Sequence, residues 1–140
     1  MRLFLDTEFN GFGGELISMA VVPETGDFWY EVCDLPANPH PWVKEHVLPV
    51  LDRVPLNPDV FRMMFHIFIT QFTDPEIYCD WHADAEHFFS LLAGRDYGSS
   101  LDFACTMRVL KTPKGAPVPV TPHNALSDAR ALKDWYLNGH

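Results

Sequence analysis

The segment RLFLDTEFNGFGGELISMAVV, residues 2–22, decides the fold of this 140-residue chain. Its first part, Arg2–Leu5, and its last part, Glu15–Val22, are apolar runs, and the glycine-rich stretch Asn10–Gly14 between them is typical of a hairpin. A third apolar run, Phe28–Val32, follows a further turn. The segment therefore predicts a three-stranded antiparallel meander whose first strand is buried on both faces.

Helices and strands alternate in the rest of the chain. We expect, in chain order, a short helix within 42–51, a helix over 59–72, a strand at 77–79, a helix over 80–92, a strand or short helix within 101–110, and a final helix over 124–137. This order indicates an α/β fold with a mixed sheet. The length fits a single domain, residues 1–140.

The charge of the chain limits how it could bind nucleic acid. Its 19 acidic and 10 basic side chains give a formal net charge of −9. This balance argues against a protein that holds nucleic acid by a broad basic face. It leaves open a small nucleic-acid footprint bridged by metal ions.

The cysteines and the apolar runs bear on the compartment. Cys33, Cys79 and Cys105 are odd in number and widely spaced, without a CxxC pair, which predicts free thiols in a reducing compartment. The N-terminus begins without the apolar stretch of a signal peptide, and the most apolar run, residues 60–69, is too short and too polar to span a membrane. We therefore expect a cytoplasmic protein without a membrane partner.

Two carboxylates follow the first apolar run. If the strand continues through Asp6 and Glu8, these side chains at i and i+2 project from the same face. Two carboxylates on one face of a buried strand repel each other and lose solvation, and Mg²⁺ or Mn²⁺ is the cation that such oxygens select. The alternative is that the strand ends at Leu5 and that both acids are solvated turn residues.

A second acidic signal is Asp128, in the sequence HNALSDA near the end of the chain. The proline-rich loop 111–122 delivers His123 just before the last helix, and Asp128 is expected in the second turn of that helix. The small residues Ala125 and Ala129 allow a close approach to the sheet, which would hold Asp128 near the core. The alternative is an ordinary surface helix with a solvent-facing aspartate.

A third signal lies where a strand ends and a helix begins, the place where open α/β folds position their chemistry. Asp80 stands at the end of the strand and Asp84 in the first turn of the helix. Either residue could instead be a helix cap.

Together, the three signals resemble the DEDDh branch of the RNase H-like 3′-to-5′ exonuclease superfamily. The first motif of that branch, DxE on the first strand, matches Asp6 and Glu8, and its third motif, HxAxxDA, matches residues 123–129 at every specified position. In the middle motif, Asp80 stands where the branch has Asn, and Ala83 replaces an aromatic residue. The DTEF start, the ELIS strand and the short length are also similar to a compact bacterial and phage exoribonuclease family.

The resemblance implies an RNase H-like mixed sheet flanked by helices and a hydrolase that shortens RNA from its 3′ end, releasing nucleoside 5′-monophosphates. It implies that Asp6, Glu8, Asp84 and Asp128 hold two Mg²⁺ or Mn²⁺ ions, with Asp6 as the bridging ligand, and that His123 is the general base. It also implies a homodimer. DNA as the substrate, and a non-catalytic nucleic-acid-binding or partner-binding module of the same fold, are the alternatives.

Other side chains near these motifs have two readings each. Phe9, Asp80 and Trp81 are candidates for nucleotide binding, with core packing as the alternative for Phe9 and a dimer contact or partial burial as the alternative for Trp81. Three aromatic residues form an interface patch or belong to the core: Trp29, Tyr30 and Trp42. Three basic residues before His123 meet substrate phosphates or belong to a solvated loop: Arg108, Lys111 and Lys114.

Overall fold

The computed structural model of the chain describes residues 1–96 and 98–139. Its elements are, in chain order, β1 (Arg2–Phe9), β2 (Leu16–Pro23), β3 (Trp29–Val32), α1 (Pro41–His46), the single-turn 3₁₀ helix η1 (Leu48–Val50), α2 (Pro58–Ile69), β4 (Glu76–Cys79), α3 (His82–Ala93), β5 (Thr106–Val109) and α4 (Ala125–Leu137). The sequence predicts this order except within 42–51, where α1 and η1 stand in place of the single short helix expected. The ambiguous segment 101–110 contains a strand.

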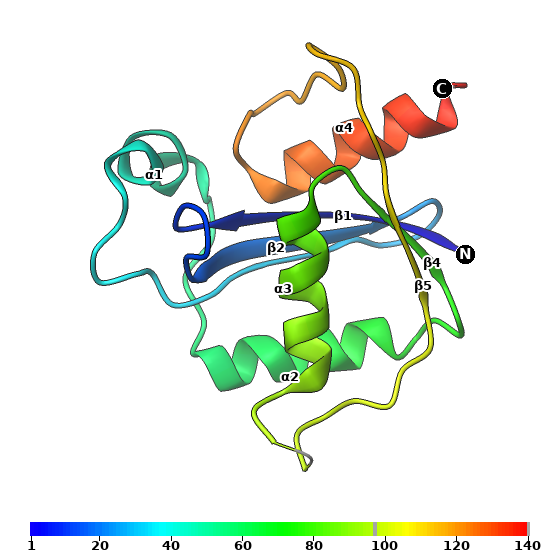
Figure 1. The fold of residues 1–140 in the computed structure, drawn as a ribbon, viewed down its shortest axis with the longest axis horizontal. Coiled ribbons are helices and arrows are strands. Elements are labelled where there is room, and N and C mark those ends of the chain that lie inside the picture. The colour runs from blue at the N-terminus through cyan, green and yellow to red at the C-terminus, as the bar shows by residue number, and fades with distance from the viewer. Residues whose placement is uncertain (97, 140) are drawn as a thin grey trace.

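Within the described residues, five strands form one mixed sheet in the order β3-β2-β1-β4-β5 (Figure 1). β1, β2 and β3 form the predicted antiparallel meander, whereas β4 and β5 run parallel to β1 and to each other. β1 is the central strand, and Leu3, Phe4 and Leu5 are fully buried, as expected for a strand covered on both faces. The predicted α/β fold with a mixed sheet is confirmed.

Helices cover both faces of the sheet. Leu3 and Leu5 of β1 pack with side chains of α2 and α3, while Phe4 packs with side chains of α1 and α4. Figure 1 shows α2 and α4 on opposite sides of β1 and β2. Because alternate side chains of a strand point to opposite faces, β1 contributes to both cores.

Helix α4 approaches the sheet closely because small residues face it. Ala125 and Ala129 are fully buried in the core that α4 shares with β1 and β2, and Ala20 of β2 lies in the same core. Leu132 continues the buried side of the helix. The close approach predicted from the two alanines is confirmed, and it brings the first turn of α4 over β1.

Helix α2 is apolar on both its inward and its outward side. It begins after Asn57, whose side chain accepts a hydrogen bond from the backbone N–H of Asp59 at 2.9 Å, and Pro58 occupies the first helical position. Its inward side chains are buried: Phe61, Phe65, Phe68 and Ile69. Its outward side chains are 36–62% exposed: Val60, Met63, Met64 and Ile67. A group of exposed apolar side chains on one side of a helix is typical of a surface that another molecule covers.

Of the two readings that the sequence allows for Trp29 and Tyr30, an interface patch or the core, the interface patch is wrong. They are only 8% and 4% exposed. The Trp29 ring packs edge-on against Phe61 of α2, and the Tyr30 hydroxyl donates a hydrogen bond to the Leu51 carbonyl. The core alternative therefore holds for both residues, and only Trp42, 45% exposed, stays on the surface.

The three cysteines, Cys33, Cys79 and Cys105, are free thiols, as the sequence predicts. Cys79 is buried and the other two are half-buried. None of the helices in residues 1–96 and 98–139 has the length and apolar character that a membrane crossing requires.

The packing of α4 leads to a first prediction. Ala129→Leu adds a side chain where the helix meets the sheet without spare room, so we expect the free energy of unfolding to fall by about 1–3 kcal/mol. Chemical denaturation monitored by circular dichroism measures this change. Asp134→Leu, on the exposed side of the same helix, is the matched control and should change stability by less than about 0.5 kcal/mol. Equal effects of the two substitutions would contradict the packing described above.

Candidate metal centre

Strand β1 places Asp6 and Glu8 on one face of the sheet. It continues to Phe9, so the alternative that the strand ends at Leu5 is wrong. The two acids follow Phe4 at alternate positions and therefore point toward the side covered by α4. Their antiparallel partners on β2 are small: Ala20 opposite Asp6, and Ser18 opposite Glu8.

The parallel pairing of β4 brings Asp80 to the same place. Phe4 of β1 pairs with Tyr78 of β4. Asp6 lies two residues after Phe4 and Asp80 two residues after Tyr78, so the two acids occupy equivalent positions along neighbouring chain segments. The N-cap residue of α3 is Trp81, whose side chain makes no capping hydrogen bond, so neither Asp80 nor Asp84 is the N-cap residue. The capping alternative is thereby removed for both.

Asp84 reaches the centre from the first turn of α3, as the sequence predicts. Its Oδ1 accepts two hydrogen bonds from Thr7 of β1, one from the backbone N–H at 3.1 Å and one from the hydroxyl at 2.6 Å. The residue is only 2% exposed, and its Oδ2 has no hydrogen-bond partner among the described residues. Thr7 lies between the two acids of β1 in sequence, and its role in holding Asp84 escaped the sequence analysis.

Asp128 reaches the centre from α4, in the first turn of the helix rather than the second. The N-cap residue is Asn124, whose side chain accepts from the Ser127 N–H at 3.0 Å and donates to the Val50 carbonyl at 2.8 Å. The backbone of His123 donates a hydrogen bond to the Asp128 carboxylate, and His123 itself has a φ of 68°, a left-handed conformation that is strained for a residue with a side chain.

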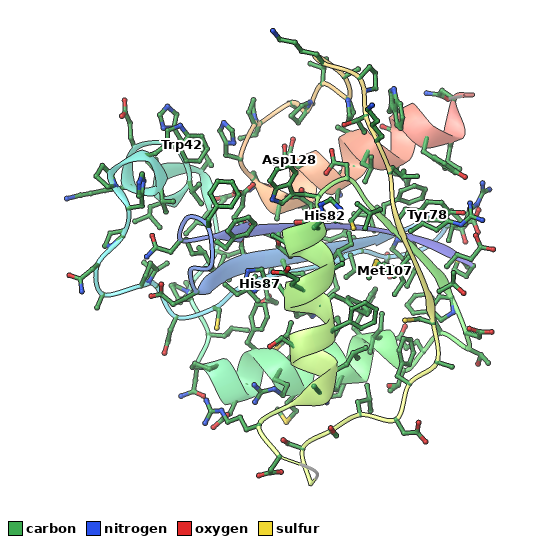
Figure 2. All side chains as sticks on the ribbon, in the orientation of Figure 1. Trp42, Tyr78, His82, His87, Met107 and Asp128 are labelled. Carbon is green, nitrogen blue, oxygen red and sulfur yellow. The ribbon has the colours of Figure 1, made fainter. Side chains whose placement is uncertain are left out.

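The five carboxylates form two groups that share Asp6. One ligand oxygen each from Asp6, Asp80 and Asp84 lie within 4.8 Å of one another, and the same holds for Asp6, Glu8 and Asp128. Figure 2 shows Asp128 near the start of α4 and His82 near the start of α3. The donors are all carboxylate oxygens, the set that Mg²⁺ and Mn²⁺ select over softer metals.

Burial and mutual repulsion make these acids poor at holding negative charge by themselves. Desolvation and then the Asp84 charge raise the pKa of Asp6 well above its ordinary value. Desolvation and the neighbouring Asp128 raise the pKa of Glu8 to about 9, and desolvation raises the pKa of Asp84 to about 7 and that of Asp128 to about 6. Burial also raises the pKa of Asp80.

The residues fit a divalent metal on two observations. Asp6 Oδ2 and Asp84 Oδ2 are buried without a hydrogen-bond partner in residues 1–96 and 98–139, although each can accept one. Their carboxylates belong to the same group of three. Buried charges of one sign need either protons or a cation, and divalent cations neutralise several carboxylates at once.

His123 lies beside the aromatic surface of α1. Its ring contacts Trp42 edge-on, with centroids 4.8 Å apart, and lies 6.0 Å from the ring of His46. Partial burial and then His46 lower the pKa of His123 below its ordinary value. Among the described residues, the two close groups of metal-ligating atoms contain no histidine, so His123 is outside them.

An aromatic cavity of about 450 Å³ borders the acids on the Glu8 side. Its lining includes Phe9 and Trp81, the two aromatic residues that the sequence predicts for nucleotide binding, together with Phe12 and Trp42. Phe12 is 89% exposed and lies 6.2 Å from Trp81, ring centroid to ring centroid. Phe9 is thus partly exposed at a cavity and is not a core residue.

The hairpin between β1 and β2 shapes this cavity. Gly11 has a φ of 72°, and a side chain on Gly14 would collide with the backbone of Asn10. Asn10 accepts a hydrogen bond from the His40 N–H at 2.7 Å and donates to the Asn38 carbonyl at 3.0 Å. This amide ties the hairpin that carries Phe12 to the segment leading into α1. No pattern in the sequence identified Asn10, because it looks like any turn residue.

No protein-family model matches the chain, and no curated protein matches it. The chemistry of the acidic centre and of its surroundings is therefore the ground for assigning a function.

The raised pKa values lead to a second prediction. An acid whose pKa is higher in the folded than in the unfolded protein binds more protons when folded, so stability falls as pH rises between the two values. For Glu8, Asp84 and Asp128 this window runs from about 4 to about 9. We expect the Tm of metal-free protein to fall by at least about 5 °C between about pH 5 and pH 8, and Mg²⁺ or Mn²⁺ to restore it mainly at the higher pH.

Asp6→Asn keeps the shape of Asp6 and removes its charge. The variant should have a flatter pH dependence, a higher metal-free Tm at neutral pH and a smaller stabilisation by metal. Differential scanning calorimetry with and without chelator measures all three. If the Tm of the unmodified protein changes neither with pH nor with added metal, the prediction is wrong.

Proposed function

We propose that the chain is a metal-dependent 3′-to-5′ exoribonuclease of the DEDDh type, with an RNase H-like fold. The observation that carries the proposal is the convergence of carboxylates on Asp6 from β1, from the end of β4 and from the first turns of α3 and α4. Two-metal sites held by carboxylates are a common solution for phosphodiester hydrolysis, because the ions stabilise both the attacking and the leaving oxygen.

The two groups of acids would hold one ion each. Asp6, Glu8 and Asp128 form one set of ligands and Asp6, Asp80 and Asp84 the other, so Asp6 would belong to both. Thr7 and the backbone of His123 fix the orientation of Asp84 and Asp128. When bound, divalent ions supply Lewis-acid activation of phosphodiester hydrolysis.

His123 is the proposed general base. Its lowered pKa favours the neutral imidazole, in which a ring nitrogen can accept the proton of the attacking water. The edge-on contact with Trp42 restricts the orientation of the ring. The left-handed backbone at His123 also supports a functional role, because strained conformations persist where the surroundings enforce them, often at functional sites.

The aromatic cavity is the proposed site of the terminal nucleotide. Phe9, Phe12, Trp42 and Trp81 offer stacking faces, which accept any base because every base has an aromatic face. Glu8 borders the same cavity, so a base held there lies next to the acids. DNA remains the second candidate substrate, since no described residue is assigned to the 2′-hydroxyl.

The proposed compartment is the cytoplasm. Three free thiols, one of them buried, are compatible with a reducing environment.

Digestion of end-labelled substrates tests the proposed activity. The protein is incubated with an RNA that has a 3′ overhang and with the matching DNA, in Mg²⁺, Mn²⁺ or chelator. We expect stepwise shortening from the 3′ end of the RNA, release of nucleoside 5′-monophosphates and complete inhibition by chelator. If neither polymer is shortened with either metal, the chain is not a nuclease and the non-catalytic binding module is the better hypothesis.

Paired variants separate the roles of Asp80 and Asp84. Asp84→Asn should lower kcat at least about 100-fold, because it removes a ligand that Thr7 holds in place. Asp80→Asn should have a smaller effect, and Asp134→Asn, on α4 away from the acids, should have none. Activity that survives in Asp84→Asn and is lost in Asp80→Asn would reverse the assignment of the middle motif.

We also propose that the chain forms a homodimer through the outward side of α2. The exposed parts of Val60, Met63, Met64 and Ile67 amount to roughly 400 Å², enough for the apolar centre of an interface of about 800 Å² per partner. Their spacing is symmetric about Met63 and Met64, so an antiparallel α2 of a second copy would set Val60 opposite Ile67. Such self-complementarity is what a two-fold interface requires.

Sedimentation velocity tests the dimer. The unmodified protein should sediment as a dimer, and Met63→Glu combined with Ile67→Glu should convert it to a folded monomer, because charges would be buried at the interface. Val54→Glu, at an 82% exposed position outside α2, is the control and should leave the dimer intact. A monomeric unmodified protein would refute the interface.

A further inference from the structure

Positive charge is unevenly distributed along the chain. Residues 1–107 contain 17 of the 19 acidic and five of the ten basic side chains, a formal charge of −12, whereas residues 108–140 contain two acidic and five basic side chains, a formal charge of +3. The excess of acid therefore belongs to the first three quarters of the sequence, and the segment that includes the end of β5, the proline-rich loop and α4 differs from it in sign.

The arginines of the acidic part are already paired. Arg2 contacts Glu24, Arg53 contacts Glu31, and the last two contact Asp59: Arg62 and Arg95. Within residues 1–96 and 98–139, by contrast, Arg108, Lys111 and Lys114 make no ion pair. Arg108 lies over the Tyr78 ring at 5.9 Å. These three cations are therefore available to an anion from outside the chain.

Lys111 is the cation placed beside the acidic centre. It lines a cavity of about 670 Å³ together with Asp80 and Trp81. Two further cavities border a carboxylate of the centre, the aromatic one beside Glu8 and one under the proline-rich loop beside Asp80 and Asp128. Among all residues that line these three cavities, Lys111 is the only lysine or arginine.

The backbone around Lys111 is held on both sides. The N–H of Leu110 donates to the Cys79 carbonyl at 2.7 Å, which extends the pairing of β5 with β4 by one residue. The Thr112 side chain hydrogen-bonds with Asp80. Lys111 therefore extends from a fixed point, between two residues that are attached to the same stretch of chain, 79–80.

Two cavities meet at Trp81. This residue lines both the aromatic cavity, which borders Glu8, and the Lys111 cavity, which borders Asp80, so the two cavities reach the acidic centre at different acids. A strand whose last base occupies the aromatic cavity, and whose last phosphodiester lies at the acids, would continue into the Lys111 cavity. The next phosphate along the strand would then lie beside the ammonium group.

We propose that Lys111, supported by Arg108 and Lys114, binds the phosphate of the nucleotide that precedes the scissile bond. The ligand class is a single-stranded oligonucleotide of three or more nucleotides, because a dinucleotide has no phosphate beyond the one that is cleaved. The inference rests on the proposed nuclease function and adds a direction to it: the substrate runs from the aromatic cavity, past the acids, along the basic segment 108–114.

Fluorescence anisotropy tests the proposal without requiring turnover. The probes are 5′-labelled di- and hexanucleotides whose terminal linkage is a phosphorothioate, measured with Mg²⁺ at several salt concentrations. We expect the unmodified protein to bind the hexanucleotide at least about tenfold more tightly than the dinucleotide. Lys111→Gln should remove most of that preference and reduce the salt dependence of hexanucleotide binding by about 0.7 in logarithmic slope, the value for one phosphate contact on a single strand.

Two further variants complete the test. Lys111→Arg should restore the preference for the longer probe, and Arg95→Gln, which removes the same charge beside Asp59, should leave both affinities unchanged. A thermal unfolding midpoint equal to that of the unmodified protein excludes misfolding of Lys111→Gln.

The failures of the two proposals are distinguishable. Suppose that the unmodified protein cleaves RNA and prefers the hexanucleotide, and that Lys111→Gln shows the same preference for the hexanucleotide. Then only the role of Lys111 is overturned. If the unmodified protein neither binds nor cleaves any probe, both the nuclease function and the phosphate site are overturned.

Discussion

The repulsion among the carboxylates around Asp6 is the constraint on which the rest of the structure depends. Five acids share a small, partly buried volume, and their raised pKa values measure how poorly that volume holds negative charge. The fold holds these acids close together in spite of their repulsion. It does so through a central strand, the first turns of two helices and the small residues that allow α4 to approach the sheet closely. Partial positive charge at the first turns of α3 and α4 offsets part of the repulsion around Asp84 and Asp128.

Strand β1 determines where the acids lie relative to the sheet. It takes antiparallel partners on one side and a parallel partner on the other, so one strand sets the positions of acids that come from distant parts of the sequence. Alternation along β1 sends Asp6 and Glu8 to the face of α4 and Thr7 to the face of α3, where it holds Asp84. The centre thus lies between the two layers of helices instead of belonging to either one.

Much of the fold, and the acids of the centre, could be predicted from the sequence, because they follow from local patterns. The glycines after Phe9 mark the hairpin, and the spacing of Asp6 and Glu8 marks a shared face as soon as the strand is known to continue. The pairing of Phe4 with Tyr78 could not be predicted, and it is this register that sets Asp80 beside Asp6. The sequence left open whether Trp29 is buried, because its cover, α2, lies about thirty residues later in the chain. Asn10 and Thr7 act through side-chain hydrogen bonds, which no periodic pattern in the sequence marks.

The tie between Asn10 and the segment before α1 has a consequence for how such a protein can change. The walls of the aromatic cavity come from a hairpin tip and a short helix that one amide side chain holds together, whereas the acids are fixed by the sheet and its cores. Insertions or substitutions at Gly11–Gly14 would therefore alter the size of what the cavity admits while leaving the acids where they are. Under the proposed function, selectivity and chemistry would therefore depend on separate parts of the structure, and substitutions in the hairpin would change the first without disturbing the second.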